Sequence, residues 1–209
     1  MSKENYTEHF GVLCYDNKKK PMKISRETYI DQKFLESDNE MIKKIVKICF
    51  QNYDRNMLFF KKLDYTDFNY NLEKIINDYH FVQIKDLNKV SKKQGIYILV
   101  LDEYKQIYIG VSKNIKHRIQ EHWSNRKSIN RLIFGSPDSS RLSIDSFGYF
   151  DTTRIYVLLN DDYDWLFTIE QNFVDDFPND YLLNRTAGGI RGDNFDEAVI
   201  NMKRRRFND

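Results

Sequence analysis

The sequence predicts an α+β fold, in which a small antiparallel sheet is covered by helices. Residues 95–101 and 106–111 are apolar runs rich in Ile, Val and Tyr, and a short polar link separates them. Two such runs are typical of a β-hairpin. Residues 39–52, 67–79 and 162–177 instead carry apolar side chains at helical spacing. One chain therefore combines a hairpin with amphipathic helices.

The first 90 residues are expected to form a mainly helical region. Two helices are predicted there, at 39–52 and 67–79, and the apolar residues 57–60 between them are expected to be buried. Residues 81–84 are typical of a short strand that leads into the hairpin. The region carries no recognisable motif.

Each strand of the predicted hairpin carries one tyrosine of interest, Tyr97 or Tyr108. Side chains alternate between the two faces along a strand, so Tyr97 shares a face with Leu99, and Tyr108 shares one with Gly110. Both phenols reach the same side of the hairpin if the register of the two strands allows it.

A helix is predicted after the hairpin, at residues 114–123, with Ser112 as its N-cap. Arg118 and His122 are four residues apart and therefore neighbours on one helix face. Between residues 113 and 131 the only acid is Glu121. Clustered cations suit phosphate contact, and the residues predicted to contact DNA are Lys113, Lys116, Arg126, Lys127 and Arg131.

A third strand and a further helix complete the pattern. Residues 154–159 read RIYVLL, and the predicted helix 162–177 has Leu166, Ile169, Phe173 and Val174 at core spacing. Glu170 lies beside that apolar stripe, where a carboxylate is costly unless a positive group meets it. Residues 181–189 contain Asn184 and a Gly pair, which indicates a turn.

Taken together, these residues resemble the GIY-YIG nuclease superfamily. The resemblance rests on Gly95-Ile96-Tyr97 and Tyr108-Ile109-Gly110, followed in order by Arg118, Glu170 and Asn184. It covers about residues 91–192 and implies a catalytic domain with a three-stranded antiparallel sheet flanked by helices. The long interval between Arg118 and Glu170 implies an insertion around residues 124–152. His122, one turn after Arg118, is similar to a position in the restriction endonucleases of this superfamily.

The resemblance implies a metal-dependent DNA endonuclease, most like a type II restriction endonuclease. Its catalytic residues would be Tyr97, Tyr108, Arg118, His122, Glu170 and Asn184. Tyr97 is the favoured general base, although the choice between the two tyrosines stays open. Arg118 would hold the scissile phosphate, Glu170 would bind Mg²⁺ (with Mn²⁺ as a substitute), and Asn184 would orient its neighbours.

Two other functions fit the same residues. One is a phage or mobile-element endonuclease of the homing type, and the other is a non-catalytic DNA-binding module that retains the fold. Each residue taken alone also has an ordinary structural role: strand tyrosine, solvated helix cation, surface acid or turn asparagine. The joint pattern favours a nuclease, because Tyr97, Arg118 and Glu170 are all intact.

Composition limits the remaining choices. The 209 residues carry a net charge of only +2, and no apolar run approaches the roughly 20 residues of a membrane span. Cys14 and Cys49 have no zinc-site spacing, so we expect a cytoplasmic protein with reduced thiols. The expected partner is double-stranded DNA, with no membrane and no small-molecule cofactor. One active site per chain cannot cut two strands at once, so a homodimer or sequential nicking is expected.

Three parts of the chain are therefore expected. They are a mainly helical region (1–90), a catalytic domain (91–192) and a basic C-terminal helix or tail (193–209). We expect the helical region to serve DNA recognition or dimerisation. Lysines at 18–20 and the basic residues 203–206 are further candidates for phosphate contact. Because every catalytic candidate follows residue 91, a fragment from about Leu87 onward is expected to fold on its own.

Overall fold

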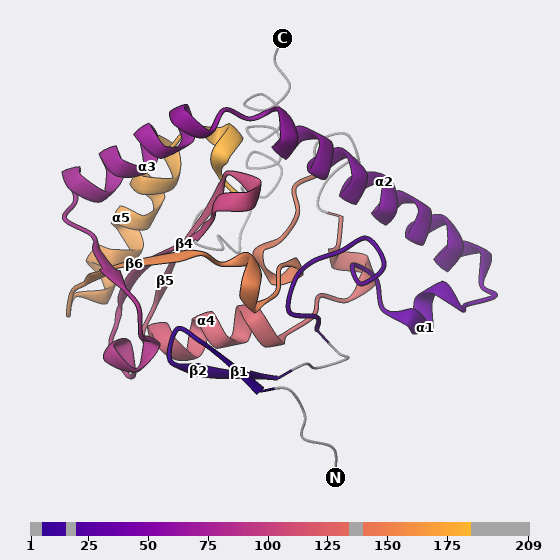
Figure 1. The fold of residues 1–209 in the computed structure, drawn as a ribbon, viewed down its shortest axis with the longest axis horizontal. Coiled ribbons are helices and arrows are strands. Elements are labelled where there is room, and N and C mark those ends of the chain that lie inside the picture. Colours follow the sequence, from indigo (N-terminus) through magenta and orange to yellow (C-terminus); the bar gives the residue numbers. More distant parts are fainter. Residues whose placement is uncertain (1–5, 16–19, 134–139, 185–209) are drawn as a thin grey trace.

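The computed structural model describes residues 6–15, 20–133 and 140–184, and its main body is a sheet with helices on both sides (Figure 1). The basic segment predicted at 193–209 lies outside these residues. No helix within the described ranges is long and apolar enough to cross a membrane. The helices and strands are β1 (Tyr6–His9), β2 (Val12–Tyr15), α1 (Gln32–Leu35), α2 (Glu40–Lys62), α3 (Tyr65–Asp78), β3 (Val82–Ile84), β4 (Gly95–Leu101), β5 (Gln106–Ser112), α4 (Ile115–Ser124), β6 (Arg154–Leu159) and α5 (Tyr163–Asp176).

The central sheet has four strands in the order β3-β6-β4-β5, and each neighbouring pair is antiparallel. The mixed fold, the hairpin and the third strand are confirmed. The predicted number of three strands is corrected, because β3 also pairs with β6, with Val82 opposite Val157. Since β3 precedes residue 91, the sheet begins before the expected start of the catalytic domain.

All seven residues of β4 are buried, because both faces of the sheet are covered. Tyr97, Leu99 and Leu101 belong to one apolar cluster together with side chains of α2 and α4. The alternate residues Ile96 and Ile98 belong to a second cluster with side chains of α3 and α5. Figure 1 shows α3 and α5 together on one side of the sheet and α4 on the other. The tyrosine face is thus the α4 face.

The N-terminal region differs from the prediction in two ways. It contains a β-hairpin, β1–β2, that the sequence did not indicate. In addition, α2 continues through residues 57–60, which were expected to lie between two helices. Phe60 is buried there as expected, but Leu58 is 59% exposed. Asn39 caps the start of α2 by accepting hydrogen bonds from the amides of Met41 and Ile42, and no Gly or Pro interrupts the helix afterwards.

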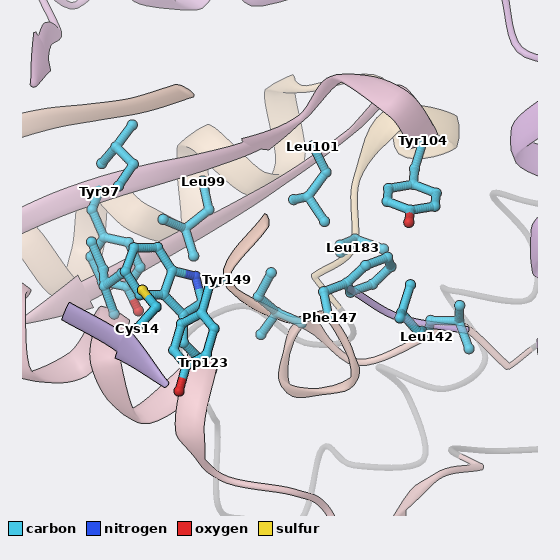
Figure 2. Packing of buried hydrophobic residues seen from close by; sticks show 14 of the residues in the cluster. Cys14, Tyr97, Leu99, Leu101, Tyr104, Trp123, Leu142, Phe147, Tyr149 and Leu183 are labelled. Carbon is cyan, nitrogen blue, oxygen red and sulfur yellow. The ribbon is translucent and has the colours of Figure 1, made fainter. Parts of the chain in front are cut away.

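The N-terminal region shares a core with the sheet. Cys14 of β2 and Phe60 of α2 belong to the same buried cluster as Tyr97 and Trp123. Figure 2 shows Cys14 beside Tyr97 and Trp123 in that cluster. Lys20 was expected in an exposed basic cluster, but it is only 2% exposed and donates a hydrogen bond to the main-chain carbonyl of His122. The segment before residue 91 therefore packs directly on the tyrosine face.

This packing reverses our expectation for a truncated chain. A fragment that begins at Leu87 loses the part of the cluster that contains Cys14, Cys49 and Phe60. Burial of each such apolar side chain stabilises the fold by about 1.5–3 kcal/mol, whereas the whole fold of a domain is stable by about 5–15 kcal/mol. We therefore expect the fragment to show no cooperative thermal transition by circular dichroism. A cooperative transition close to that of the full chain would show that residues 1–86 form a separate unit.

Candidate active site at the tyrosine face

The strand register places the two tyrosines on one face. Tyr97 lies opposite Gly110, and Leu99 lies opposite Tyr108, so the tyrosines are diagonal neighbours. Their ring centroids are 6.2 Å apart. Tyr97 is only 1% exposed, whereas Tyr108 is partly exposed. The expectation that both phenols reach one side of the hairpin is confirmed.

The glycines of the two triplets allow close approaches in the sheet. A Cβ atom on Gly110 would lie 2.5 Å from the Tyr97 hydroxyl oxygen, so this hydroxyl occupies the space that any side chain would need. A Cβ atom on Gly95 would lie 2.3 Å from the carbonyl oxygen of Leu158 on β6. Glycine is therefore required at both positions for steric reasons.

Helix α4 carries Arg118 and His122 to the tyrosines. Its N-cap is Asn114, whose side chain accepts a hydrogen bond from the His117 amide, so the prediction of Ser112 as the cap was wrong. The His122 Nε2 atom is 2.9 Å from the Tyr97 hydroxyl oxygen, and the imidazole meets the Tyr108 ring edge-on at 5.1 Å. The imidazole thus lies beside both phenols, with its ring centroid 6.1 Å from that of Tyr97 and 5.1 Å from that of Tyr108.

Arg118 is the positive charge that acts on both phenols. Its side chain is 46% exposed and forms an ion pair with Glu121 at 3.1 Å. Burial raises the pKa of Tyr97 well above the ordinary value of 10.0, Tyr108 raises it further, and the charge of Arg118 lowers it. Burial likewise raises the pKa of Tyr108, and Arg118 again acts in the opposite direction. Both phenols are therefore protonated at neutral pH.

Sequence reasoning did not find the next residue of the site, which is Asp145. It lies in the short 3₁₀ helix η4 (Ile144–Ser146), within the segment interpreted as an insertion. Its Oδ1 atom is 2.5 Å from His122 Nδ1, and its Oδ2 atom is 3.2 Å from the Lys127 Nζ atom. No motif or helical spacing connects Asp145 to His122, so only the folded chain identifies it.

Glu170 reaches the site from the opposite face of the sheet. Helix α5 begins as predicted after Asp162, whose side chain caps the amide of Trp165. Glu170 is 4% exposed, and its Oε2 atom has no hydrogen-bond partner within the described residues. Burial raises its pKa to about 7, while the Val111 amide and the charge of Arg118 act in the opposite direction.

A divalent cation fits this carboxylate. An unsatisfied buried carboxylate oxygen is costly, and a cation would satisfy it. Among residues 6–15, 20–133 and 140–184, no group of three His, Cys, Asp or Glu side chains could hold a metal. A site built on Glu170 would therefore use one protein carboxylate and leave positions for water and phosphate oxygens, as Mg²⁺ sites commonly do.

Asn184 lies at the outer edge of β5 and holds its backbone. Its Oδ1 atom accepts a hydrogen bond from the Ile109 amide at 2.9 Å, and its Nδ2 atom donates one to the Ile109 carbonyl at 2.7 Å. Ile109 lies between Tyr108 and Gly110, so Asn184 fixes the strand that carries them. The buried Arg141, which the sequence did not single out, donates to the carbonyls of Leu182 and Asn184, at 2.8 Å each.

The five cations predicted to contact DNA are not equivalent. Arg126 forms an ion pair with Asp31 at 3.0 Å, and Lys127 forms the ion pair with Asp145. Lys113 lies over the Tyr163 ring at 4.8 Å, and Lys116 donates to the Asn88 side chain at 2.6 Å. Arg131 is exposed. Their contacts with DNA stay a prediction, since Arg126 and Lys127 already neutralise acids of the protein itself.

Comparison with known proteins identifies the hairpin and the helix that follows it. Residues 93–149 match the family model of the GIY-YIG catalytic domain. This range contains Tyr97, Tyr108, Arg118, His122 and Asp145, whereas Glu170 and Asn184 follow it. No curated protein and no solved structure matches the chain. Residues 93–149 are therefore identified as a GIY-YIG catalytic domain.

Proposed function

We propose that this chain is an Mg²⁺-dependent DNA endonuclease of the type II restriction class, in which Mn²⁺ can replace Mg²⁺. One observation carries the proposal: the phenols of Tyr97 and Tyr108 and the imidazole of His122 meet on the tyrosine face. The guanidinium of Arg118 acts on both phenols, and so does the buried carboxylate of Glu170. The hydrogen bond between Tyr97 and His122 supports the restriction class, because His122 occupies the position that resembles those enzymes.

Tyr97 is proposed as the general base for the attacking water. An ionised phenol is scarce at neutral pH, because burial raises the pKa of Tyr97 well above 10.0. The hydrogen bond to His122 offers another route, in which Tyr97 takes a proton from water while its own proton passes to the Nε2 atom. The phenol then never has to be ionised before the reaction begins.

Arg118 is proposed to hold the scissile phosphate. Its guanidinium stays charged and can donate two parallel hydrogen bonds to phosphate oxygens. Glu170 would hold the divalent cation, which when bound supplies positive charge for the phosphate and the leaving oxygen. Asn184 keeps Tyr108 in place through Ile109.

The proposed function is tested by incubating the full chain with plasmid and phage DNA in Mg²⁺, Mn²⁺ or EDTA and sequencing the ends. A type II restriction enzyme gives fixed ends at one short sequence, and EDTA stops the reaction. Scattered ends or persistent nicks would contradict the restriction class but support an endonuclease. Absence of cleavage in both metals would contradict the proposed function. Light scattering of the DNA complex would show whether a homodimer forms.

The roles of the two tyrosines can be separated by removing one hydroxyl at a time. We expect Tyr97→Phe to lower the single-turnover cleavage rate by roughly 10²-fold or more, because general base catalysis is lost while the ring still packs. Tyr108→Phe should have a smaller effect, since Tyr108 meets the imidazole through its ring at 5.1 Å, whereas Tyr97 meets it through its hydroxyl. The reverse order would exchange the two roles, and full activity of both variants would refute a tyrosine base.

A further inference from the structure

Asp145 contacts the ring nitrogen of His122 that does not contact Tyr97. The imidazole is 2% exposed, with Tyr97 at Nε2 and Asp145 at Nδ1. The second carboxylate oxygen is held by Lys127, and the Asp145 amide donates to Ser143 Oγ at 3.4 Å. Lys127 thus holds the carboxylate itself, and Ser143 holds the backbone that carries it.

We infer that Asp145 is a positioning residue for the proposed cleavage reaction: it holds His122 in the tautomer whose Nε2 atom accepts the proton of Tyr97. The inference rests on the proposed function as far as cleavage is concerned. The tautomer itself can be tested without any reaction. Within the described residues the side chain of Asp145 contacts His122 and Lys127, and of these two only His122 contacts Tyr97. The effect of Asp145 on Tyr97 is therefore expected to pass through His122.

The charge states around His122 support this assignment. Burial alone raises the pKa of Asp145, but the hydrogen bond from His122 and the charges of His122 and Lys127 outweigh it and lower the pKa to about 2. Burial lowers the pKa of His122, although Asp145 acts against it. At neutral pH an ionised carboxylate therefore faces a neutral imidazole, whose Nδ1 atom must carry the hydrogen that the carboxylate accepts.

Other charged and titratable groups surround the imidazole. Tyr97 faces it from β4 and Tyr108 faces it from β5. Arg118, one turn earlier on α4, lowers its pKa, as does the buried Lys20, whose ammonium is bonded to the His122 carbonyl. Asp145 is the group that raises the pKa of His122. It is therefore the group able to stabilise an imidazolium during the reaction.

The proton balance of the step is simple. The attacking water forms the new P–O bond and gives its proton to the Tyr97 oxygen, and the Tyr97 proton moves to His122 Nε2. The P–O bond to the leaving oxygen breaks, and that oxygen takes a proton from solvent. His122 then carries a positive charge against the Asp145 carboxylate until Nε2 returns its proton to solvent. An orienting carboxylate of this kind need not become protonated itself.

The first experiment determines the tautomer by ¹⁵N NMR of the imidazole in the full chain. In the wild type we expect Nδ1 to be protonated and Nε2 to be unprotonated at pH 8. In Asp145→Asn the side-chain amide can donate to Nδ1, so the hydrogen should move to Nε2 and point at the Tyr97 oxygen. Asp54→Asn, which removes an ion-paired carboxylate on α2, should leave the wild-type tautomer. A protonated Nε2 in the wild type would overturn the inference, even if no variant folds.

The second experiment measures single-turnover cleavage of the same DNA as a function of pH. We expect Asp145→Asn to be slower by roughly 10²-fold. The acidic limb of its profile should move to lower pH, because the group that raises the pKa of His122 is gone. Combined with His122→Ala, the same substitution should cost little more than His122→Ala alone. If Asp145→Asn lowers the rate equally with and without His122→Ala, or if the acidic limb of the profile does not move, Asp145 has only a structural role. If the wild type cuts no DNA, the proposed function fails, and the NMR result still decides the role of Asp145.

Discussion

Glu170→Gln is expected to abolish cleavage while DNA binding stays nearly intact. The substitution keeps the size of the side chain but removes the buried carboxylate that would anchor the cation. Phosphate contacts elsewhere on the protein survive, and these dominate affinity for DNA. Cleavage should be tested with Mg²⁺ and binding by fluorescence anisotropy at two salt concentrations. Cleavage at the wild-type rate would show that Glu170 does not hold the metal.

The same substitution is expected to make the fold more stable above neutral pH. Because the pKa of Glu170 is raised to about 7 in the folded chain, the folded state keeps a proton that the unfolded state loses at lower pH. The ordinary pKa of a glutamate is 4.5. The free energy of unfolding therefore falls by about 3 kcal/mol as the pH rises from 4.5 to about 7. At pH 8 we expect Glu170→Gln to melt roughly 6–12 °C higher than the wild type, and at pH 4.5 we expect no difference.

Divalent cations provide the control for this result. Mg²⁺ should raise the melting temperature of the wild type at pH 8, because it binds the folded chain. The Gln variant should show no such rise. A variant that is less stable than the wild type at pH 8 would mean that the carboxylate makes contacts worth more than its burial costs.

Arg118→Ala is expected to lower the cleavage rate by roughly 10³-fold, because the charge that develops on the phosphate is no longer neutralised. The side chain is half-exposed and its ion pair with Glu121 lies on the surface of its own helix, so the fold should lose little stability. Arg26→Ala is a suitable control, since Arg26 also pairs with one acid on the surface and lies on the N-terminal side of α1.

Arg118→Lys separates geometry from charge. An ammonium keeps the positive charge but cannot donate two parallel hydrogen bonds to a phosphate, so we expect little recovery of the rate. Single-turnover cleavage of the plasmid measures both variants. A lysine variant with full activity would show that Arg118 acts only as a point charge.

Much of the sheet could be predicted because its strands are locally distinct. The hairpin and the strand RIYVLL are apolar runs bounded by polar residues, and both lie where the sequence placed them. The length of α2 could not be predicted, because the buried Asn52 and Asn56 break its apolar pattern. Asn56 Nδ2 donates to the carbonyls of Asn52 and Ser140, and the second of these contacts exists only in the folded chain.

The N-terminal hairpin and two residues near the active site were missed for similar reasons. The turn of β1–β2 uses Phe10 and Gly11, both with positive φ, whereas Asn-Gly or Asp-Gly would have been the usual signal. Asp145 and Lys20 meet His122 across sequence separations of 23 and 102 residues. Periodicity and motifs describe neighbours along the chain and say nothing of such contacts. Tyr97, Tyr108 and Arg118 could be found because they lie within one short motif.

The closure of β5 by residues 182–184 limits how two copies of the chain can meet. β5 is an outer strand of the sheet, and an outer strand normally offers free backbone groups to another chain. Here the Leu183 amide donates to the Ile107 carbonyl at 2.8 Å. The Asn184 side chain forms hydrogen bonds with both the amide and the carbonyl of Ile109. A second copy cannot extend the sheet across this edge. Any dimer of this chain must therefore form through another surface.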